Sequence, residues 1–122
     1  MIVIHKYYLT EYFFSNVQFM EEKVKYMDMD NIIEYLDVRE ENEKIVLIIF
    51  AEDLTNENLK RLRKLSYKNI SLILIGTEEQ INILFTDNFK IKKAHVNKII
   101  SPIKIEYLKK LLEMEIYKCL VD

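Results

Sequence analysis

Two acidic residues follow the longest apolar run of this 122-residue chain and could take part in chemistry. They are Glu52 and Asp53, directly after residues 45–51. A carboxylate in that place could accept a phosphoryl group or help to bind a hard divalent cation. Alternatively, Asp53, Thr55 or Asn56 accepts hydrogen bonds from the free N–H groups that begin the next helix. The sequence favours capping, because no acidic pair follows the first apolar run to complete a metal site.

Two histidines are the other candidates for acid–base chemistry. His5 ends the first apolar run and His95 precedes the last expected strand, and imidazole titrates near neutral pH. Ser101 and Thr77 carry hydroxyl groups on neighbouring strands, but the sequence identifies no acid that would orient a histidine toward them. We therefore predict that both histidines are polar loop residues and that the protein is not an enzyme.

The rarest residue types exclude several kinds of site. Cys119 is the single cysteine, so the chain forms neither an internal disulfide nor a zinc site with several thiolates. We predict that it is a buried structural thiol. Gly76 is the single glycine, whereas phosphate-cradling loops need several so that backbone N–H groups can approach the anion. No metal and no cofactor is expected.

Composition predicts one folded domain over residues 1–122. Half of the residues are apolar and 31% are charged, which supports both a core and a charged surface. The net charge of −2 provides no excess of positive charge for a phosphate backbone, so nucleic acid is not an expected partner. No apolar run is long enough to span a membrane and no signal peptide is recognisable, so a cytoplasmic protein is expected.

The apolar pattern predicts an α/β fold. Runs without polar alternation, at 45–51 and 71–76, are typical of strands buried on both faces of a parallel sheet. Shorter strands are expected at 1–4 and 98–100, and an edge strand at 24–27. Helical spacing predicts helices at 9–20, 32–36, 59–65, 81–85 and 105–119, the fourth opened by a capping box at 77–80. This alternation predicts a three-layer α/β/α sandwich, in which 87–96 is either an extra strand or a loop.

The third of these helices has a strongly basic surface. Its basic residues are Lys60, Arg61, Arg63 and Lys64, with Lys68 nearby. Such a surface could contact an acidic partner or a nucleic-acid backbone. The default interpretation is a solvated helix flank.

The order of the elements and the last strand resemble the receiver domain of two-component response regulators. The segment Ile99-Ile100-Ser101-Pro102-Ile103, followed by Glu106-Tyr107-Leu108, is similar to the signature that ends the fifth strand of that family. The resemblance covers essentially the whole chain. It implies a flavodoxin-like fold with a five-stranded parallel sheet in the order 2-1-3-4-5.

The resemblance also implies where a phosphorylation site should be, and the residues there are of the wrong kind. The family holds Mg²⁺ with two acids after the first strand, where this chain has His5 and Lys6. It accepts phosphate on an aspartate at the end of the third strand, where this chain has Phe50, or Ala51 if the register shifts by one. A phenyl ring cannot accept phosphate, and neither an imidazole nor an ammonium group is a hard oxygen ligand.

Three further positions complete the comparison with the family. Thr77 matches the hydroxyl residue after the fourth strand, but Ser101 occupies the place of the lysine before the proline, and Lys98 that of the aromatic switch residue. We therefore interpret the chain as a degenerate pseudo-receiver. It keeps the fold and has lost the phosphorylation switch.

The expected function is phosphorylation-independent protein–protein interaction in two-component signal transduction. Receivers characteristically pair through their fourth helix, fifth strand and fifth helix, where this chain carries Lys98, Lys109, Lys110 and Glu113. The partner is another protein or a second copy in a homodimer. Two alternatives stay open: a receiver that is phosphorylated on Asp53 or Glu52, and an anti-sigma-antagonist-like (STAS) domain phosphorylated on Thr55.

Overall fold

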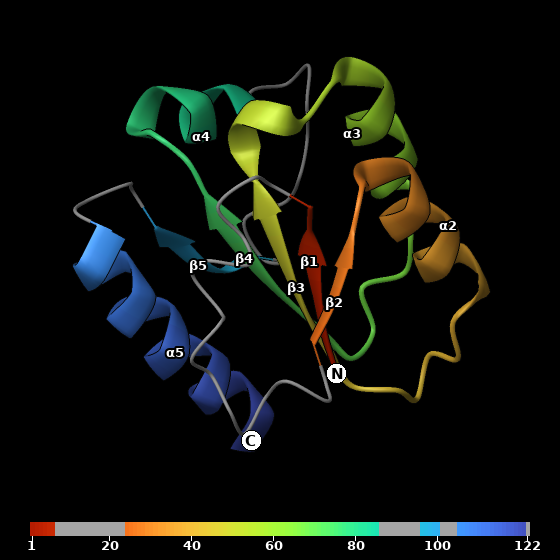
Figure 1. The fold of residues 1–122 in the computed structure, drawn as a ribbon. Coiled ribbons are helices and arrows are strands. Elements are labelled where there is room, and N and C mark those ends of the chain that lie inside the picture. Colours follow the sequence, from red (N-terminus) through yellow and green to blue (C-terminus); the bar gives the residue numbers. More distant parts are fainter. Residues whose placement is uncertain (7–23, 86–95, 101–104, 122) are drawn as a thin grey trace.

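Parallel strands form the centre of the computed structural model, which describes residues 1–6, 24–85, 96–100 and 105–121 (Figure 1). The strands lie in one sheet in the order β2-β1-β3-β4-β5, with every neighbouring pair parallel. Their bounds are β1 Ile2–His5, β2 Val24–Met27, β3 Ile45–Phe50, β4 Ile70–Ile75 and β5 Val96–Ile100. The predicted α/β class and the parallel order 2-1-3-4 are confirmed.

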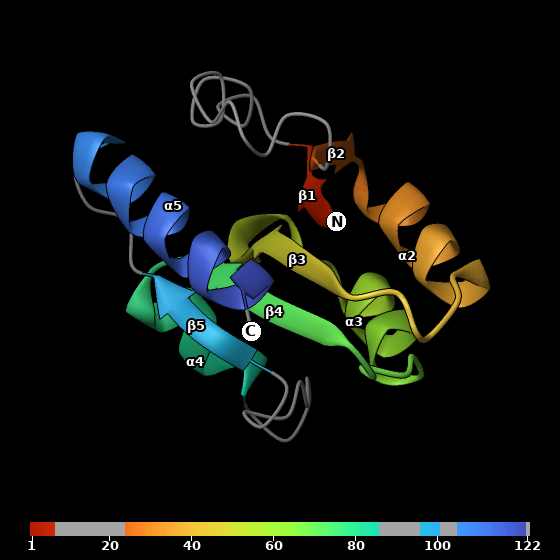
Figure 2. The ribbon, with the colours of Figure 1, turned by 90° about the horizontal axis from the view of Figure 1, so that it is seen from below.

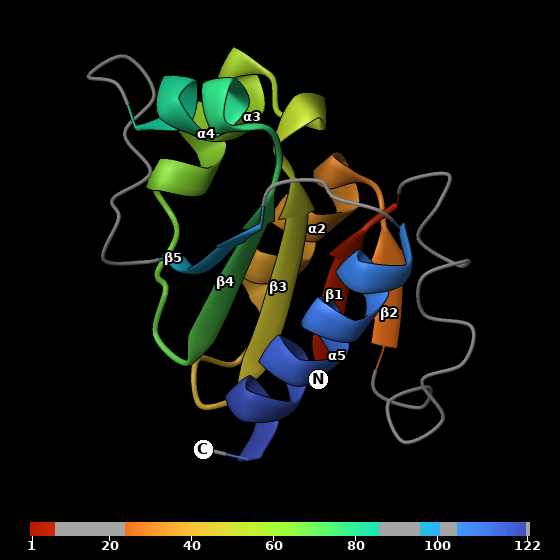
Figure 3. The same cartoon turned by 90° about the vertical axis from the view of Figure 1, so that its left-hand side faces the viewer.

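Helices cover both faces of this sheet. One face carries α2, α3 and α4, and the other carries α5 (Figures 2 and 3). A short 3₁₀ turn, η2, connects β3 to α3. The bounds are α2 Met29–Val38, η2 Ala51–Asp53, α3 Asn56–Arg63, α4 Glu78–Leu84 and α5 Ile105–Val121. The predicted helix at 9–20 and the ambiguous residues 87–95 lie outside the described residues.

Two apolar clusters, one on each face of the sheet, make up the core. Successive side chains of a strand point to opposite faces, so Leu47 and Ile49 of β3 pack on the side of α2, α3 and α4. Val46 and Ile48 pack on the other side, together with Leu112 and Ile116 of α5. All six residues of β3 are buried. The continuous apolar run at 45–51 therefore reflects a strand that is covered on both faces.

Each of the three helices on one face begins at a side chain that accepts a backbone hydrogen bond. Asp28 accepts from the N–H of Asn31 and caps α2, and Thr55 accepts from the N–H of Asn58 and caps α3. Thr77 caps α4 in the predicted capping box, which is confirmed. These caps satisfy N–H groups that have no partner within the helix. They also fix where the chain turns at the carboxyl edge of the sheet.

No helix in the described part of the chain combines the length and the apolar character that crossing a bilayer requires.

Candidate functional site

The carboxyl edge of the sheet brings together several of the residues that the sequence singled out. β1 ends at His5, β3 ends at Phe50 and β4 ends at Ile75, one residue before Gly76. Because the strands are parallel, these ends lie at the same edge, where open α/β sheets place their sites. The edge therefore holds His5 and Phe50, two of the positions that the resemblance to receiver domains singled out.

His5 is buried at this edge, and the prediction of a polar loop histidine is wrong. It is the last residue of β1 and only 8% of it is exposed. Its Nε2 atom lies 3.3 Å from Oδ2 of Asp53. The acid that could orient a histidine, which the sequence did not identify, is therefore Asp53, 48 positions along the chain.

Asp53 has a different role from the predicted one. It is the last residue of η2, and the side-chain cap of α3 is Thr55, so Asp53 does not cap that helix. Glu52 precedes it and is exposed. The turn that follows β3 directs the Asp53 carboxylate toward the end of β1. The pair therefore connects two neighbouring strands at the edge of the sheet.

Burial shifts both members of this pair toward their neutral forms. Desolvation lowers the pKa of His5 below 6.5, although the carboxylates of Asp53 and Asp28 oppose this shift. Desolvation also raises the pKa of Asp53 above 3.8, with Glu52 adding to the rise and His5 opposing it. Both shifts have burial as the main cause. His5 is therefore neutral at pH 7 and can donate or accept a proton at this edge.

We expect the contribution of His5 to stability to depend on pH. Because the pKa of His5 is lower in the folded than in the unfolded chain, the stability contributed by the neutral imidazole is complete above pH 6.5. It is lost as the pH falls from 6.5 toward the lower pKa of the folded state. Urea unfolding of the wild type and of His5→Gln, which cannot be protonated, should show a smaller difference at about pH 5.5 than at about pH 7.5. An equal difference at both pH values would contradict the burial of a neutral imidazole.

Phe50, which the resemblance placed at the phosphoacceptor position, is a buried apolar residue at the end of β3. It is 5% exposed and belongs to the core cluster on the α5 face of the sheet, together with Ile48 and Ile75. Ala51, the alternative position, is also buried and begins η2. Within the described residues there is no group of three or more side chains suited to holding a metal ion. The described residues of the edge therefore do not supply the clustered carboxylate oxygens that Mg²⁺ requires.

The other residues compared with the receiver family are placed as follows. Lys6 is exposed after β1. The hydroxyl of Thr77 accepts a hydrogen bond from the N–H of Gln80 at 3.2 Å, and the Thr77 N–H donates to the Gln80 side chain at 2.9 Å. Thr77 therefore serves as a helix cap. Ser101 lies outside the described residues, as does His95.

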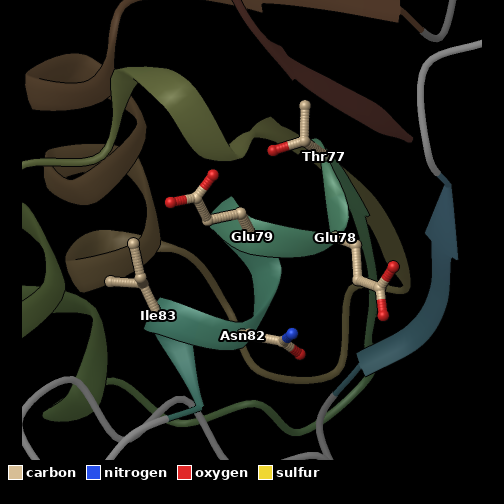
Figure 4. Close-up of a pocket in the computed structure, with 5 residues that line it drawn as sticks. All are labelled: Thr77, Glu78, Glu79, Asn82 and Ile83. Atoms are coloured by element: carbon tan, nitrogen blue, oxygen red, sulfur yellow. The ribbon is translucent and has the colours of Figure 1, made fainter.

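A shallow hollow of 640 Å³ lies beside α4 and is lined by acidic and apolar side chains (Figure 4). Its lining residues are Thr77, Glu78, Glu79, Asn82 and Ile83. A phosphoryl group there would lie near two carboxylates, which repel it. The hollow therefore does not provide the missing phosphate site.

The flank of α5 is the described part of the predicted interaction face. Lys110, Glu113 and Tyr117 follow one another at spacings of three and four residues, which places them on one side of the helix. Tyr117 is 55% exposed and Met114, on the adjacent side, is 56% exposed. Lys109 lies in α5 and Lys98 in β5, but the structure does not describe their side chains. The sequence analysis missed Tyr117, although its spacing from Lys110 was available.

Comparisons with protein-family models, curated proteins and solved structures found no match to this chain. Its function is therefore argued from the geometry of the carboxyl edge and from the exposed surfaces.

Proposed function

We propose that the protein is a cytoplasmic pseudo-receiver with a flavodoxin-like receiver fold, which acts by binding another protein without being phosphorylated. The observation that carries the proposal is the buried phenyl ring of Phe50 at the end of β3. A receiver needs a carboxylate there. The all-parallel order of β2, β1, β3 and β4 supports a receiver over the anti-sigma-antagonist alternative, which opens with paired strands.

The chemistry of the edge supports the loss of the phosphorylation switch. A transferred phosphoryl group carries negative charge that a cation must neutralise, and receivers use Mg²⁺ held by clustered acids. Here the residue at the end of β1 that should supply an acid is His5, which lies beside Asp53 and whose neutral form is favoured by burial. Asp53 is thus engaged with an imidazole. The described residues therefore provide no acid cluster for the cation, and the carboxylate of Asp53 is in contact with His5.

The flank of α5 supports the second half of the proposal, which is binding of a protein partner. Exposed aromatic residues flanked by charges are typical of binding surfaces, because the ring supplies apolar area and the charges supply specificity. Tyr117, which follows Glu113 by four residues and Lys110 by seven on the same side of α5, has this composition. The partner is expected to bury the tyrosine ring, and a second copy of the chain remains one candidate for it.

Incubation with a small-molecule phosphodonor tests the absence of phosphorylation. With acetyl phosphate and Mg²⁺, we expect the intact mass of the protein to stay unchanged, because Phe50 cannot accept the group and no described acid cluster holds the metal. A receiver with an intact acidic site serves as the positive control. Gain of one phosphoryl group on Asp53 or Glu52 would show that the chain is a working receiver instead.

Affinity capture with matched variants tests the binding half of the proposal. The variant Lys110→Glu/Tyr117→Ala changes the α5 flank, and the control Lys44→Glu/Val38→Ala changes exposed residues elsewhere. We expect a partner that is retained by the wild type and the control to be lost by the α5 variant. Equal retention by all three proteins would exclude this flank as the binding surface.

A further inference from the structure

Two neighbouring helices, α2 and α3, expose opposite charges on the same side of the molecule. They lie next to each other on one face of the sheet (Figure 1). Residues 28–43, which include α2, contain seven acidic residues and one basic residue. Residues 57–68, which include α3, contain five basic residues and one acidic residue. This side of the protein is therefore divided into an acidic half and a basic half, although the net charge of the whole chain is only −2.

One ion pair already joins the two halves within the chain. Arg61 of α3 lies 3.4 Å from the carboxylate of Asp30 at the start of α2, and both side chains are largely exposed. At the other end of α2, the guanidinium of Arg39 donates to the backbone carbonyl of Lys68. These contacts hold the acidic and basic halves in a fixed relation. The surface that they present to a partner is therefore preorganised.

Other charges on the two helices point into solvent. Glu34 and Asp37 are exposed on α2, Lys60 is exposed on α3, and Lys64 is exposed at the C-cap of α3. None of the four takes part in an ion pair within the part of the chain that the structure describes. Their spacings of three and four residues put each pair on one stripe of its helix. Each molecule thus offers an acidic stripe and a basic stripe that run side by side.

We propose that this α2–α3 face binds a second copy of the chain, with α2 of each copy facing α3 of the other. Both helices connect parallel strands and therefore run in the same direction. A two-fold axis that passes between the two copies, parallel to α2 and α3, places the acidic stripe of each copy against the basic stripe of the other. All four helices then run in the same direction. Such an arrangement uses the same patch on both copies and closes at two.

A second copy fits this face better than a partner of one charge. A uniformly acidic or basic partner would be attracted to one stripe and repelled by the other, which lies on the neighbouring helix. A copy of the same face matches both stripes at once. Exposed ion pairs contribute little each and are screened by salt, so the dimer is expected to be weak and sensitive to ionic strength. This face is separate from the α5 flank, so the inference does not depend on the proposed function.

Sedimentation velocity on the full chain tests the proposal. We expect concentration-dependent dimerisation at about 20 mM NaCl that is lost at about 500 mM NaCl, where the screening length is only a few ångströms. Glu34→Lys/Asp37→Lys makes both stripes basic, and Lys60→Glu/Lys64→Glu makes both acidic. By symmetry each variant changes both sides of the interface, so each should raise the dissociation constant of its own dimer by about tenfold or more.

Mixing the two variants in equal amounts provides the decisive measurement. A protein with two basic stripes and one with two acidic stripes are complementary, so the mixture should form a heterodimer that neither variant forms with itself. The matched control Lys44→Glu/Glu78→Lys reverses one exposed charge of each sign outside both stripes and outside the α5 flank, and it should dimerise like the wild type. Far-UV circular dichroism establishes that the variants are folded. A monomeric wild type at low salt, unchanged dimerisation of the variants, or no association in the mixture would each overturn the proposal.

Discussion

Replacing Phe50 with alanine is expected to lower the free energy of unfolding by about 3–5 kcal/mol. The ring is 5% exposed and packs in the cluster that holds the central strands against α5. Removing it takes away buried apolar area and leaves a cavity next to Ile48 and Ile75, which sit in β3 and β4 and cannot collapse freely. Urea unfolding followed by circular dichroism at neutral pH measures the change.

Two further substitutions at this position separate packing from phosphorylation. Phe50→Leu keeps most of the apolar volume and should destabilise by only about 1 kcal/mol. Phe50→Asp introduces the residue that the receiver family uses, but it buries a carboxylate with no cation beside it, so it should destabilise at least as much as alanine. An aspartate variant as stable as the wild type, or one that gains a phosphoryl group, would show that the edge still accommodates the family's chemistry.

Replacing Gly76 with alanine is expected to lower the free energy of unfolding by about 1–3 kcal/mol. A Cβ atom at this position would lie 2.7 Å from the Cβ of Ala51 and 3.1 Å from Oε1 of Gln80. The side chain of Gln80 can move, but Ala51 is buried at the start of η2 and cannot. The destabilisation therefore comes from crowding between β4 and the turn after β3. Thermal unfolding of the variant measures it.

A double-mutant cycle isolates this contact. Ala51→Gly removes the methyl group that Gly76→Ala would strike, so the double variant should be less destabilised than the sum of the two single variants. Replacing alanine with glycine carries its own backbone cost of about 1 kcal/mol, which the Ala51→Gly single variant measures. Strict additivity of the two changes would show that the single glycine is needed for another reason.

The secondary structure of the described residues follows largely from local patterns. The apolar runs at 45–51 and 71–76 predicted β3 and β4, because a strand with two covered faces must be apolar at every position. The capping box at Thr77 was confirmed, since its hydrogen bonds join residues only three positions apart. The cap of α2 is equally local, since Asp28 accepts its hydrogen bond from Asn31, three positions along the chain.

Local patterns were misleading at the carboxyl edge. His5 was predicted to be a loop residue, and Asp53 was one of three candidates for the cap of α3, with Thr55 and Asn56. The cap is Thr55. The strand β1 continues through His5, and η2 turns Asp53 back toward it. The residues next to His5 and Asp53 in the sequence do not indicate that these two side chains are in contact.

By itself, the sequence determined which segments form buried strands, where two helices begin and that the end of the third strand has no acidic side chain. Only the tertiary structure decided that His5 contacts Asp53, that Gly76 must make room for Ala51, and that the acidic and basic helices lie side by side. Helices and strands depend on residues that are neighbours in the chain. These three relations depend on the pairing of strands and the path of turns, which bring together residues 25 to 48 positions apart.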